Sequence, residues 1–433
     1  MGSFVEYDID KWIRRFSKLT NFNFQVTPVG PPKFEPSVAV NLLIPGIMLS
    51  VAVDTTSGPP LIGLYRSIDG GFSWANSLLP LPPGYTGAEA PVVAYGFPSI
   101  FIVSAHVFPG AEGGTTVVYK SFDNGATFSA PQIVAPGYGV YINNDETNCT
   151  VDTSQSSPYL GNMYVTYNHQ FNVVNGGNST AMLNRSRDNG ATWDQAVLLS
   201  SEVDQVERPD ITVDLVGVVD VAYVTVDPSF NFIVRQSMDG GTTFVNGVVV
   251  SNVVPVPTPL PVPGWDFRVL TFANISTDRS VGPFTNQAYA VWQDNRLGYA
   301  DIFMSKRAPD TNSWSTPVSI TGAPAGTQNF FPAIDVDPLT GVVNIIYYSN
   351  QITQTLLDVY VARSINGGAT FTNTRITNAS FNPNASSPTP VPLIGDYIDI
   401  VSVPPGGYIG VWMDTSPGTF CIFAGYSDVI ITP

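Results

Sequence analysis

The sequence predicts an all-β protein, a β-propeller with seven four-stranded blades. Six copies of one short motif, Ser-x-Asp-x-Gly-x-Thr-Trp or a degenerate form of it, recur along the 433 residues. A repeat at intervals of roughly 50 to 70 residues indicates an architecture in which each repeat is one supersecondary unit. Strand-like runs flank the copies, and radially repeated four-stranded units are the blades of a propeller.

The motif itself predicts a tight β-hairpin turn. Asp and Gly supply the positive-φ positions and the side-chain-to-backbone hydrogen bonds that such a turn needs. The closing Trp or Phe is then the first inward residue of the next strand. Four copies are clear and begin at Ser67, Ser121, Ser186 and Ser237, a fifth covers 364–371 with Asn366 in place of Asp, and a sixth at 307–314 keeps only its Ser-Trp end.

Three strand-like runs precede each motif and one follows it. The fourth unit is the clearest, with runs at 208–214, 218–226 and 232–237, then the motif, then 245–250. Apolar residues alternate with polar ones in these runs, and β-branched residues are frequent, as expected for strands.

A seventh unit follows the last motif and has only three strands. The innermost strands align at seven places, near Val38, Val92, Thr150, Thr212, Phe272, Asp335 and Val401. The seventh unit contributes runs at 394–403, 408–414 and 420–426. Residues 22–28 look like its missing fourth strand, so we expect the N-terminus to close the ring and remove its open edges. Residues 22–433 therefore form a single propeller domain, with six blades as the alternative.

Residues 1–21 stand apart as a short N-terminal segment. Over 7–19 the apolar residues fall on one face of a helix and the basic residues cover the other. The apolar face holds Ile9, Trp12, Ile13, Phe16 and Leu19, and the basic face holds Lys11, Arg14, Arg15 and Lys18. The predicted helix either packs on the side or bottom of the propeller, or attaches the protein to a partner or to another subunit.

Composition narrows the classes of partner and compartment. The net charge of −16 argues against nucleic acids and anionic membrane surfaces as partners. No apolar run is long enough to span a membrane, and no signal peptide is recognisable at the start. The low lysine content favours an extracellular or surface protein. Cys149 and Cys421 fall in blades 3 and 7, so we expect free thiols.

Two rings of aligned positions predict a ligand site at the mouth of the central channel. Loops that enter the innermost strand and loops that leave the second strand open on one face, opposite the motif turns. The first ring reads Glu35, Ala90, Glu146, Arg208, Arg268, Phe331 and Asp396, and the second includes His106, His169 and Asp294. The alternative for the second ring is that these side chains only cap strand ends.

The repeated motif resembles the Asp-box, or BNR repeat, of the exo-sialidases and their relatives. In that family three arginines clamp the substrate carboxylate, a tyrosine with a glutamate partner is the nucleophile, and an aspartate is the acid/base. The resemblance implies Arg208 and Arg268 as clamp members, with Arg296 as a candidate third cation. It implies Tyr397 as nucleophile, with Glu207 or Glu146 as its partner.

One departure from the family leaves the function open. The first-blade Arg-Ile-Pro motif is absent, and Phe34-Glu35-Pro36 stands in its place. Two other functions remain: a glycosidase of different specificity, or a non-catalytic propeller that binds glycans or builds a surface assembly. The glycosidase would use a pair among Glu146, Glu207, Asp266 and Asp396. Trp265 is either a sugar-stacking platform or a pin for its own loop, and no metal or cofactor is expected.

Overall fold

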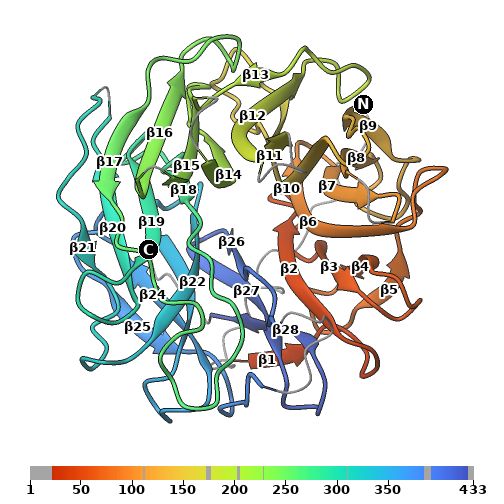
Figure 1. Cartoon of the computed structure of the whole chain (residues 1–433). Coiled ribbons are helices and arrows are strands. Elements are labelled where there is room, and N and C mark those ends of the chain that lie inside the picture. The colour runs from red at the N-terminus through yellow and green to blue at the C-terminus, as the bar shows by residue number, and fades with distance from the viewer. Residues whose placement is uncertain are drawn as a thin grey trace.

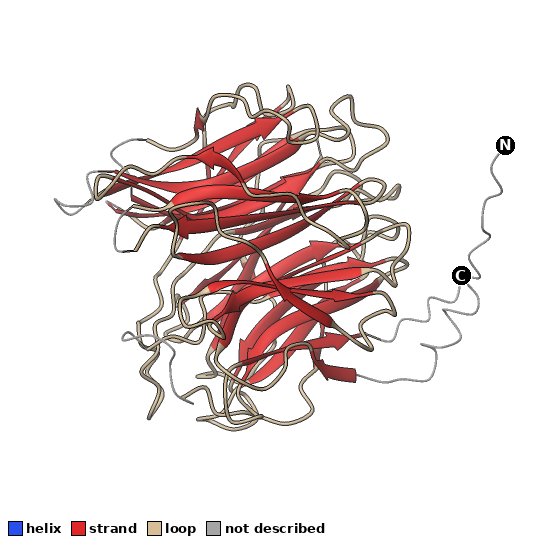
Figure 2. Cartoon of the chain, turned by 90° about the vertical axis from the view of Figure 1, so that its right-hand side faces the viewer, coloured by secondary structure: helices blue, strands red, loops and turns tan. Residues whose placement is uncertain are grey.

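The described part of the chain is a ring of seven β-sheets. The computed structural model describes residues 22–110, 113–171, 177–201, 205–227, 229–309, 311–384 and 392–427. These form strands β1 to β28, which pair into seven antiparallel sheets of four strands. The sheets surround a central channel in chain order (Figure 1). The described elements are strands and loops (Figure 2), and no helix among them is long and apolar enough to cross a membrane.

Each blade runs from an inner strand at the channel to a fourth strand at the rim. The inner strands are β2 (Lys33–Val40), β6 (Gly87–Gly96), β10 (Ile142–Val151), β14 (Gln205–Val213), β18 (Asn274–Thr277), β22 (Asn329–Val336) and β26 (Asp399–Val403). The second strands are β3 (Met48–Asp54), β7 (Ile100–Phe108), β11 (Met163–Phe171), β15 (Val219–Asp227), β19 (Ala288–Asp294), β23 (Val343–Ser349) and β27 (Gly407–Asp414). The third strands are β4 (Leu61–Ser67), β8 (Thr115–Ser121), β12 (Asn178–Ser186), β16 (Asn231–Ser237), β20 (Asp301–Arg307), β24 (Asp358–Ser364) and β28 (Cys421–Tyr426). The fourth strands are β5 (Ala75–Leu78), β9 (Gln132–Ala135), β13 (Val197–Leu198), β17 (Val248–Asn252), β21 (Val318–Ser319), β25 (Thr372–Arg375) and, for blade 7, β1 (Phe22–Gln25).

The ring closes through the N-terminal strand, as predicted. Strand β1 pairs antiparallel with β28, with Phe22 opposite Tyr426 and Gln25 opposite Phe423. This pairing supplies the fourth strand of blade 7 and covers an edge that would otherwise be open. The seven-blade prediction is confirmed, and the six-blade alternative is wrong. The helix predicted over 7–19 lies outside the described residues.

The repeated motif forms the turn between the third and fourth strands. In blade 2, Ser121 Oγ donates to Asp123 Oδ1 at 2.8 Å and accepts from the Gly125 amide at 2.8 Å. Asp123 also accepts from the Thr127 amide and hydroxyl, at 2.9 and 2.6 Å. The same Ser–Asp–Gly geometry recurs in blades 1, 3, 4 and, with Asn, 6. We name the side of the ring with these turns the turn face, and the opposite side the mouth face.

Apolar packing between adjacent blades forms the core. Strand β3 is buried along its whole length, and Trp292 and Trp412 are fully buried. A buried ion pair also joins blades 4 and 5, because Arg307 donates to both carboxylate oxygens of Asp220 at 2.8 and 2.6 Å. Cys149 in β10 and Cys421 in β28 are free and buried, as the sequence predicted.

Candidate functional site

A β-bulge in the inner strand brings the first ring of side chains into the channel mouth. In β2, Glu35 and Pro36 together oppose one residue of β3, because the pairing shifts between Phe34 and Ser37. Equivalent shifts occur in β6, β10, β14 and β22. Glu35 and Glu146 occupy these bulges at φ of 55° and 51°, in the left-handed region. Such bulges re-aim side chains and are frequent beside functional sites.

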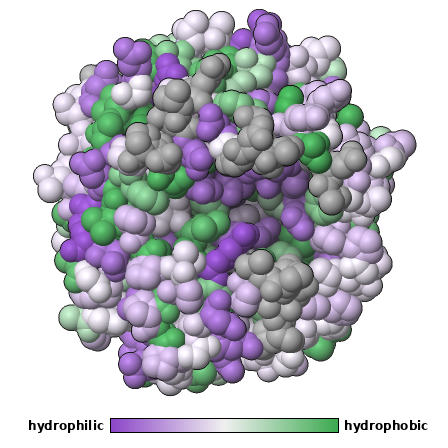
Figure 3. Space-filling view, in the orientation of Figure 1, coloured by the Kyte–Doolittle hydropathy of each residue, from purple (hydrophilic) through white to green (hydrophobic). Residues whose placement is uncertain are grey.

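Six carboxyl groups from five blades gather at this mouth. They are Glu35, Glu89, Asp145, Glu146, Glu207 and Asp396, and their charges act on one another's pKa values. The surface that lines the hollow at the centre of the mouth face is hydrophilic (Figure 3). In a chain with 12% charged residues, this concentration of acids marks the mouth as a candidate site.

Glu146 and Glu207 form a carboxyl pair between blades 3 and 4. Burial raises the pKa of Glu207 to about 7, partly offset by a hydrogen bond to the Glu146 side chain. Burial, with the charge of Glu207, raises the pKa of Glu146 well above its ordinary value. The Arg208 amide donates to Glu146 Oε2 at 2.8 Å, and Asn168 Nδ2 donates to the same oxygen at 3.2 Å. The pair can therefore hold a proton at neutral pH.

Asp145 lies beside this pair and contacts a histidine. Its Oδ1 lies 3.2 Å from His106 Nδ1 and accepts the Glu146 amide at 2.7 Å. The other ring nitrogen of His106 lies 3.0 Å from the Asn143 side-chain oxygen. His106, predicted as a binding residue, is thus at the cluster, and its charge partly offsets the rise that burial causes in the pKa of Glu89.

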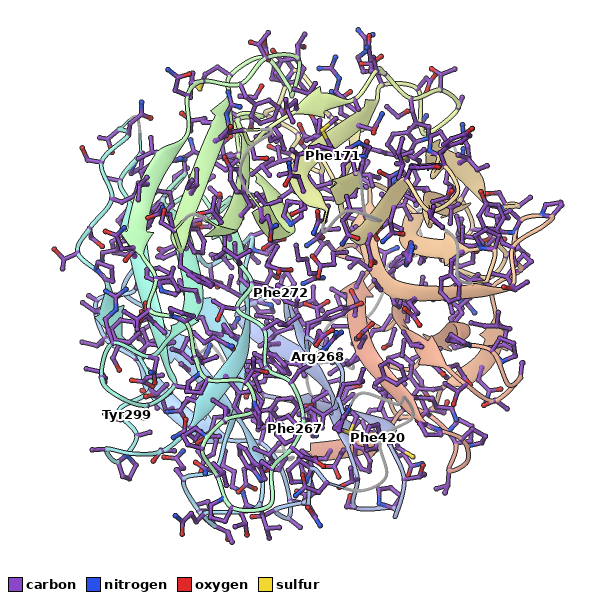
Figure 4. All side chains as sticks on the ribbon, viewed as in Figure 1. Phe171, Phe267, Arg268, Phe272, Tyr299 and Phe420 are labelled. Carbon is purple, nitrogen blue, oxygen red and sulfur yellow. The ribbon has the colours of Figure 1, made fainter. Side chains whose placement is uncertain are left out.

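Arg268 and Asp396 form an ion pair at the rim of the mouth. Arg268 Nε donates to Asp396 Oδ1 at 2.9 Å, and its Nη2 donates to Oδ2. Arg268 and Phe272 are labelled near the channel in Figure 4. Arg208 lies within inner strand β14, whereas Arg268 precedes β18 in a long loop. The prediction that Arg208 and Arg268 occupy equivalent positions of the inner strand was wrong. The long loop before β18 made the start of that strand hard to locate in the sequence.

Tyr397 forms the floor of the mouth together with Arg208. The Arg208 guanidinium lies 4.1 Å from the Tyr397 ring centroid, and the Tyr397 hydroxyl donates to the Pro91 carbonyl at 2.9 Å. Burial raises the pKa of Tyr397 well above its ordinary value, and the charge of Glu35 adds to this effect. A buried hydroxyl held by a backbone carbonyl is a poor nucleophile, so the structure disfavours the role that the sialidase resemblance implied.

Two hollows adjoin the cluster. Below Arg208 and Tyr397 the channel holds a cavity of about 200 Å³ that all seven blades line. Beside Glu207, a pocket of about 270 Å³ opens between blades 3 and 4. Its lining is rich in side-chain amides, from Asn168, Gln170, Asn178 and Gln205.

Several predicted site residues do not join the cluster. Trp265 is only 4% exposed and its Nε1 donates to the Thr355 carbonyl at 3.0 Å, so it pins its loop and offers no stacking face. Asp266 is exposed. Arg296 pairs with fully buried Asp294 at 2.5 Å, which removes it as a clamp cation and makes Asp294 a strand-end cap.

His169 also has a structural partner. Its Nδ1 lies 2.6 Å from the Asn144 side-chain oxygen, and its ring stacks on Phe171. Burial lowers the pKa of His169, which keeps the ring neutral at physiological pH. The alternative that the side chain only caps the end of its strand therefore fits His169 better than a binding role does.

Sequence reasoning left three members of the cluster out of the predicted site. Glu35 was recognised in the first ring but not assigned a role, and neither Asp145 nor Glu89 was assigned one. Glu89 directly precedes the bulge of β6, as Asp145 and Glu207 precede those of β10 and β14. The sequence signal that could have found Glu89 is therefore an acidic residue directly before the bulge in three neighbouring blades.

Among the described residues no cluster of His, Cys, Asp and Glu has the arrangement of a metal site.

No protein-family model matches the sequence, and a search of curated proteins found no match. Many solved structures share the fold, and three of them serve as examples. A protein of unknown function from Dyadobacter fermentans has a TM-score of 0.52 and 14% identity over 76% of this chain and 94% of its own.

Two further examples are fungal. A Penicillium chrysogenum α-L-arabinanase complexed with arabinobiose has a TM-score of 0.51 and 13% identity, over 95% of this chain and 98% of its own. A point mutant of a Fusarium graminearum α-L-arabinofuranosidase, in complex with an iminosugar inhibitor, has a TM-score of 0.52 and 11% identity, over 94% and 97%. At these identities the likeness shows the propeller fold alone.

Proposed function

We propose that the protein is a glycoside hydrolase that acts on an uncharged sugar at the channel mouth. The gathering of six carboxyl groups from five blades is the observation that carries this proposal. Glycoside hydrolysis needs one carboxyl group that holds a proton and another that stays ionised. A crowded, half-buried cluster supplies both, because neighbouring charges separate the pKa values of its members.

Glu207 is the proposed general acid. Its pKa of about 7 leaves it partly protonated at neutral pH, which suits proton donation to a leaving oxygen. Asp145, beside Glu146 and against His106, is the proposed second carboxyl group, which stabilises positive charge on the sugar or activates water. Glu146 positions Glu207 through the hydrogen bond between their side chains.

Charge favours a neutral sugar over sialic acid. Arg268 is paired with Asp396, and the Arg208 guanidinium stacks on Tyr397 while its Nε is buried without a hydrogen-bond partner. The acid Glu35 occupies the place of the first clamp arginine. A substrate carboxylate would meet the acidic side chains gathered at the mouth, and like charges at short range cost binding energy.

The amide-lined pocket beside Glu207 supports the same substrate class. Side-chain amides donate and accept hydrogen bonds, which suits the hydroxyl groups of a neutral sugar. Two similar structures bear the names of enzymes that act on arabinosyl sugars. Arabinosides therefore belong among the first substrates to assay.

A panel of aryl glycosides tests this function. Wild type should hydrolyse at least one neutral glycoside and leave the sialoside intact. Glu207→Gln should lose about 100-fold or more on a phenyl glycoside, but much less on a dinitrophenyl glycoside, whose leaving group needs no proton. An unchanged melting temperature in the assay buffer at pH 5 would show that the variant is folded. Failure of wild type on every neutral glycoside, or turnover of the sialoside, would contradict the proposal.

A second candidate function is glycan recognition without catalysis. Tyr138 and Tyr141 on the mouth face stack on each other, with ring centroids 6.1 Å apart, and are 68% and 57% exposed. Exposed aromatic faces bind sugar rings. A glycan array with wild type and Tyr138→Ala separates the two functions, because a pure binder would lose retention on the array and show no turnover.

A further inference from the structure

The turn face exposes large apolar side chains at equivalent positions of the repeat. The residue between the Ser and the Asp of the turn is Ile68 in blade 1 and Phe122 in blade 2, and these are 65% and 53% exposed. Met238 and Ile365 occupy the same position in blades 4 and 6 and are also exposed. Scattered exposed apolar residues are ordinary, but a cluster on one face marks a binding surface.

Two of these side chains, Ile68 and Phe122, together with Leu43 and Phe72 on the same face, are named the blade 1 patch. All four are exposed. The loop with Leu43 is tied to the blade 1 turn by the Gly70 amide, which donates to the Gly46 carbonyl at 3.0 Å. The same loop is tied to the blade 2 turn by Asn41 Nδ2, which donates to Asn124 Oδ1 at 2.7 Å. The patch therefore has a fixed scaffold.

The described chain begins at the edge of this patch. Phe22 pairs with Tyr426, the last residue of β28, and third strands end at the turn face. The ring of Phe24 lies 5.5 Å from that of Phe72 in an edge-to-face contact. Leu19 precedes Phe22 by three residues, and three residues of chain span at most about 11 Å.

We propose that residues 7–19 bind the blade 1 patch of their own propeller through their apolar face. The sequence over 7–19 places five large apolar residues, including Trp12 and Phe16, on one side of a helix. An amphipathic helix binds apolar surface through residues at this spacing. Its four basic residues, which lie on the opposite side, remain in water.

The short tether favours the same chain over a second copy. Two residues separate Leu19 from β1, so the segment meets its own patch at an effective concentration in the millimolar range. A second copy would have to compete at the much lower concentration of free protein. The proposal is independent of the proposed hydrolase activity, because the patch and the channel mouth lie on opposite faces.

Limited trypsin digestion of the full-length protein tests the proposal, because the segment contains four cleavage sites. In wild type, cleavage at Lys11 to Lys18 should be about tenfold slower than in the Leu43→Asp/Ile68→Asp double variant. The control is Leu297→Asp, which places one aspartate at an exposed leucine on the mouth face. The control should be cleaved at the wild-type rate, and protection should not change over a hundredfold dilution.

Three outcomes would overturn the proposal: equal cleavage of wild type and double variant, equal loss of protection in the control, or protection that disappears on dilution. The last would assign the patch to a second copy.

A pair of cysteine variants gives an independent readout. Phe16→Cys with Ile68→Cys should form an intramolecular disulfide on oxidation, and Phe16→Cys with Leu297→Cys should not. Cross-linking only between chains would also contradict the proposal.

Discussion

Replacement of Glu207 by glutamine should stabilise the protein at alkaline pH while it removes the proposed general acid. Glutamine has nearly the shape of a protonated glutamate and keeps a donor for the Glu146 carboxyl group. The native site raises the pKa of Glu207 from 4.5 to about 7, with burial as the largest cause. Ionisation of Glu207 therefore costs the folded state free energy that it does not cost the unfolded chain.

The sign and size of the effect follow from that shift. A raised native pKa gives a contribution to stability that is present below pH 4.5 and is lost as the pH rises through about 7. Above pH 7 Glu207 is ionised in both the folded and the unfolded state. The full pKa shift then lowers the free energy of unfolding by about 3 kcal/mol. Glu207→Gln should thus raise the melting temperature at pH 8 by about 3 °C in a chain of this size, with little change at pH 4.

Thermal unfolding by calorimetry at pH 4, 6 and 8 measures the effect. Asp123→Asn is the contrasting variant, because hydrogen bonds from Thr127 lower the pKa of Asp123 to about 2. That variant should be less stable than wild type at pH 6 and pH 8, the opposite sign. A Glu207→Gln protein that melts below wild type at pH 8 would refute the reasoning, since it would make Glu207 a stabilising structural residue.

Three further predictions concern the scaffold. Arg307→Leu leaves the fully buried Asp220 without its cation, so the free energy of unfolding should fall by about 3–5 kcal/mol in urea titrations, and Arg307→Leu/Asp220→Leu should recover most of this loss. Ser121→Ala removes three hydrogen bonds of a repeated turn and should cost about 1–2 kcal/mol in the same titrations. Cys149 and Cys421 are buried, and burial raises the pKa of Cys149 to about 11, so a thiol reagent should label neither in the folded protein at pH 7.5 and both after unfolding.

The fold was predictable because each of its signals is local. The Ser–Asp–Gly turn is stabilised by its own side chains, as at Ser121 and Asp123, so it can be recognised without tertiary information. Closure by β1 was also predictable, because a three-stranded last unit needs one more strand. Blade 5 was harder, since its inner strand is short and follows a long loop that includes Arg268.

The site was only partly predictable because its chemistry depends on contacts across the ring. Trp265 and Arg296 looked available from sequence, yet Thr355 and Asp294 engage them. The sialidase resemblance implied Tyr397 as the nucleophile, but the Tyr397 hydroxyl is held by a carbonyl of blade 2. Sequence shows which residue types occur near the mouth, whereas burial and partners decide which of them remain free to react.

The bulged inner strand explains how one repeated fold can assemble a site of this kind. Five blades have the bulge, and its residue reads Glu35, Ala90, Glu146, Arg208 and Phe331. All of these except Arg208 have positive φ, and such non-glycine residues cost of order 1–3 kcal/mol each, which the surrounding sheet must sustain. The scaffold therefore fixes the direction of each side chain at the mouth, and exchange of a single residue per blade resets the charge there.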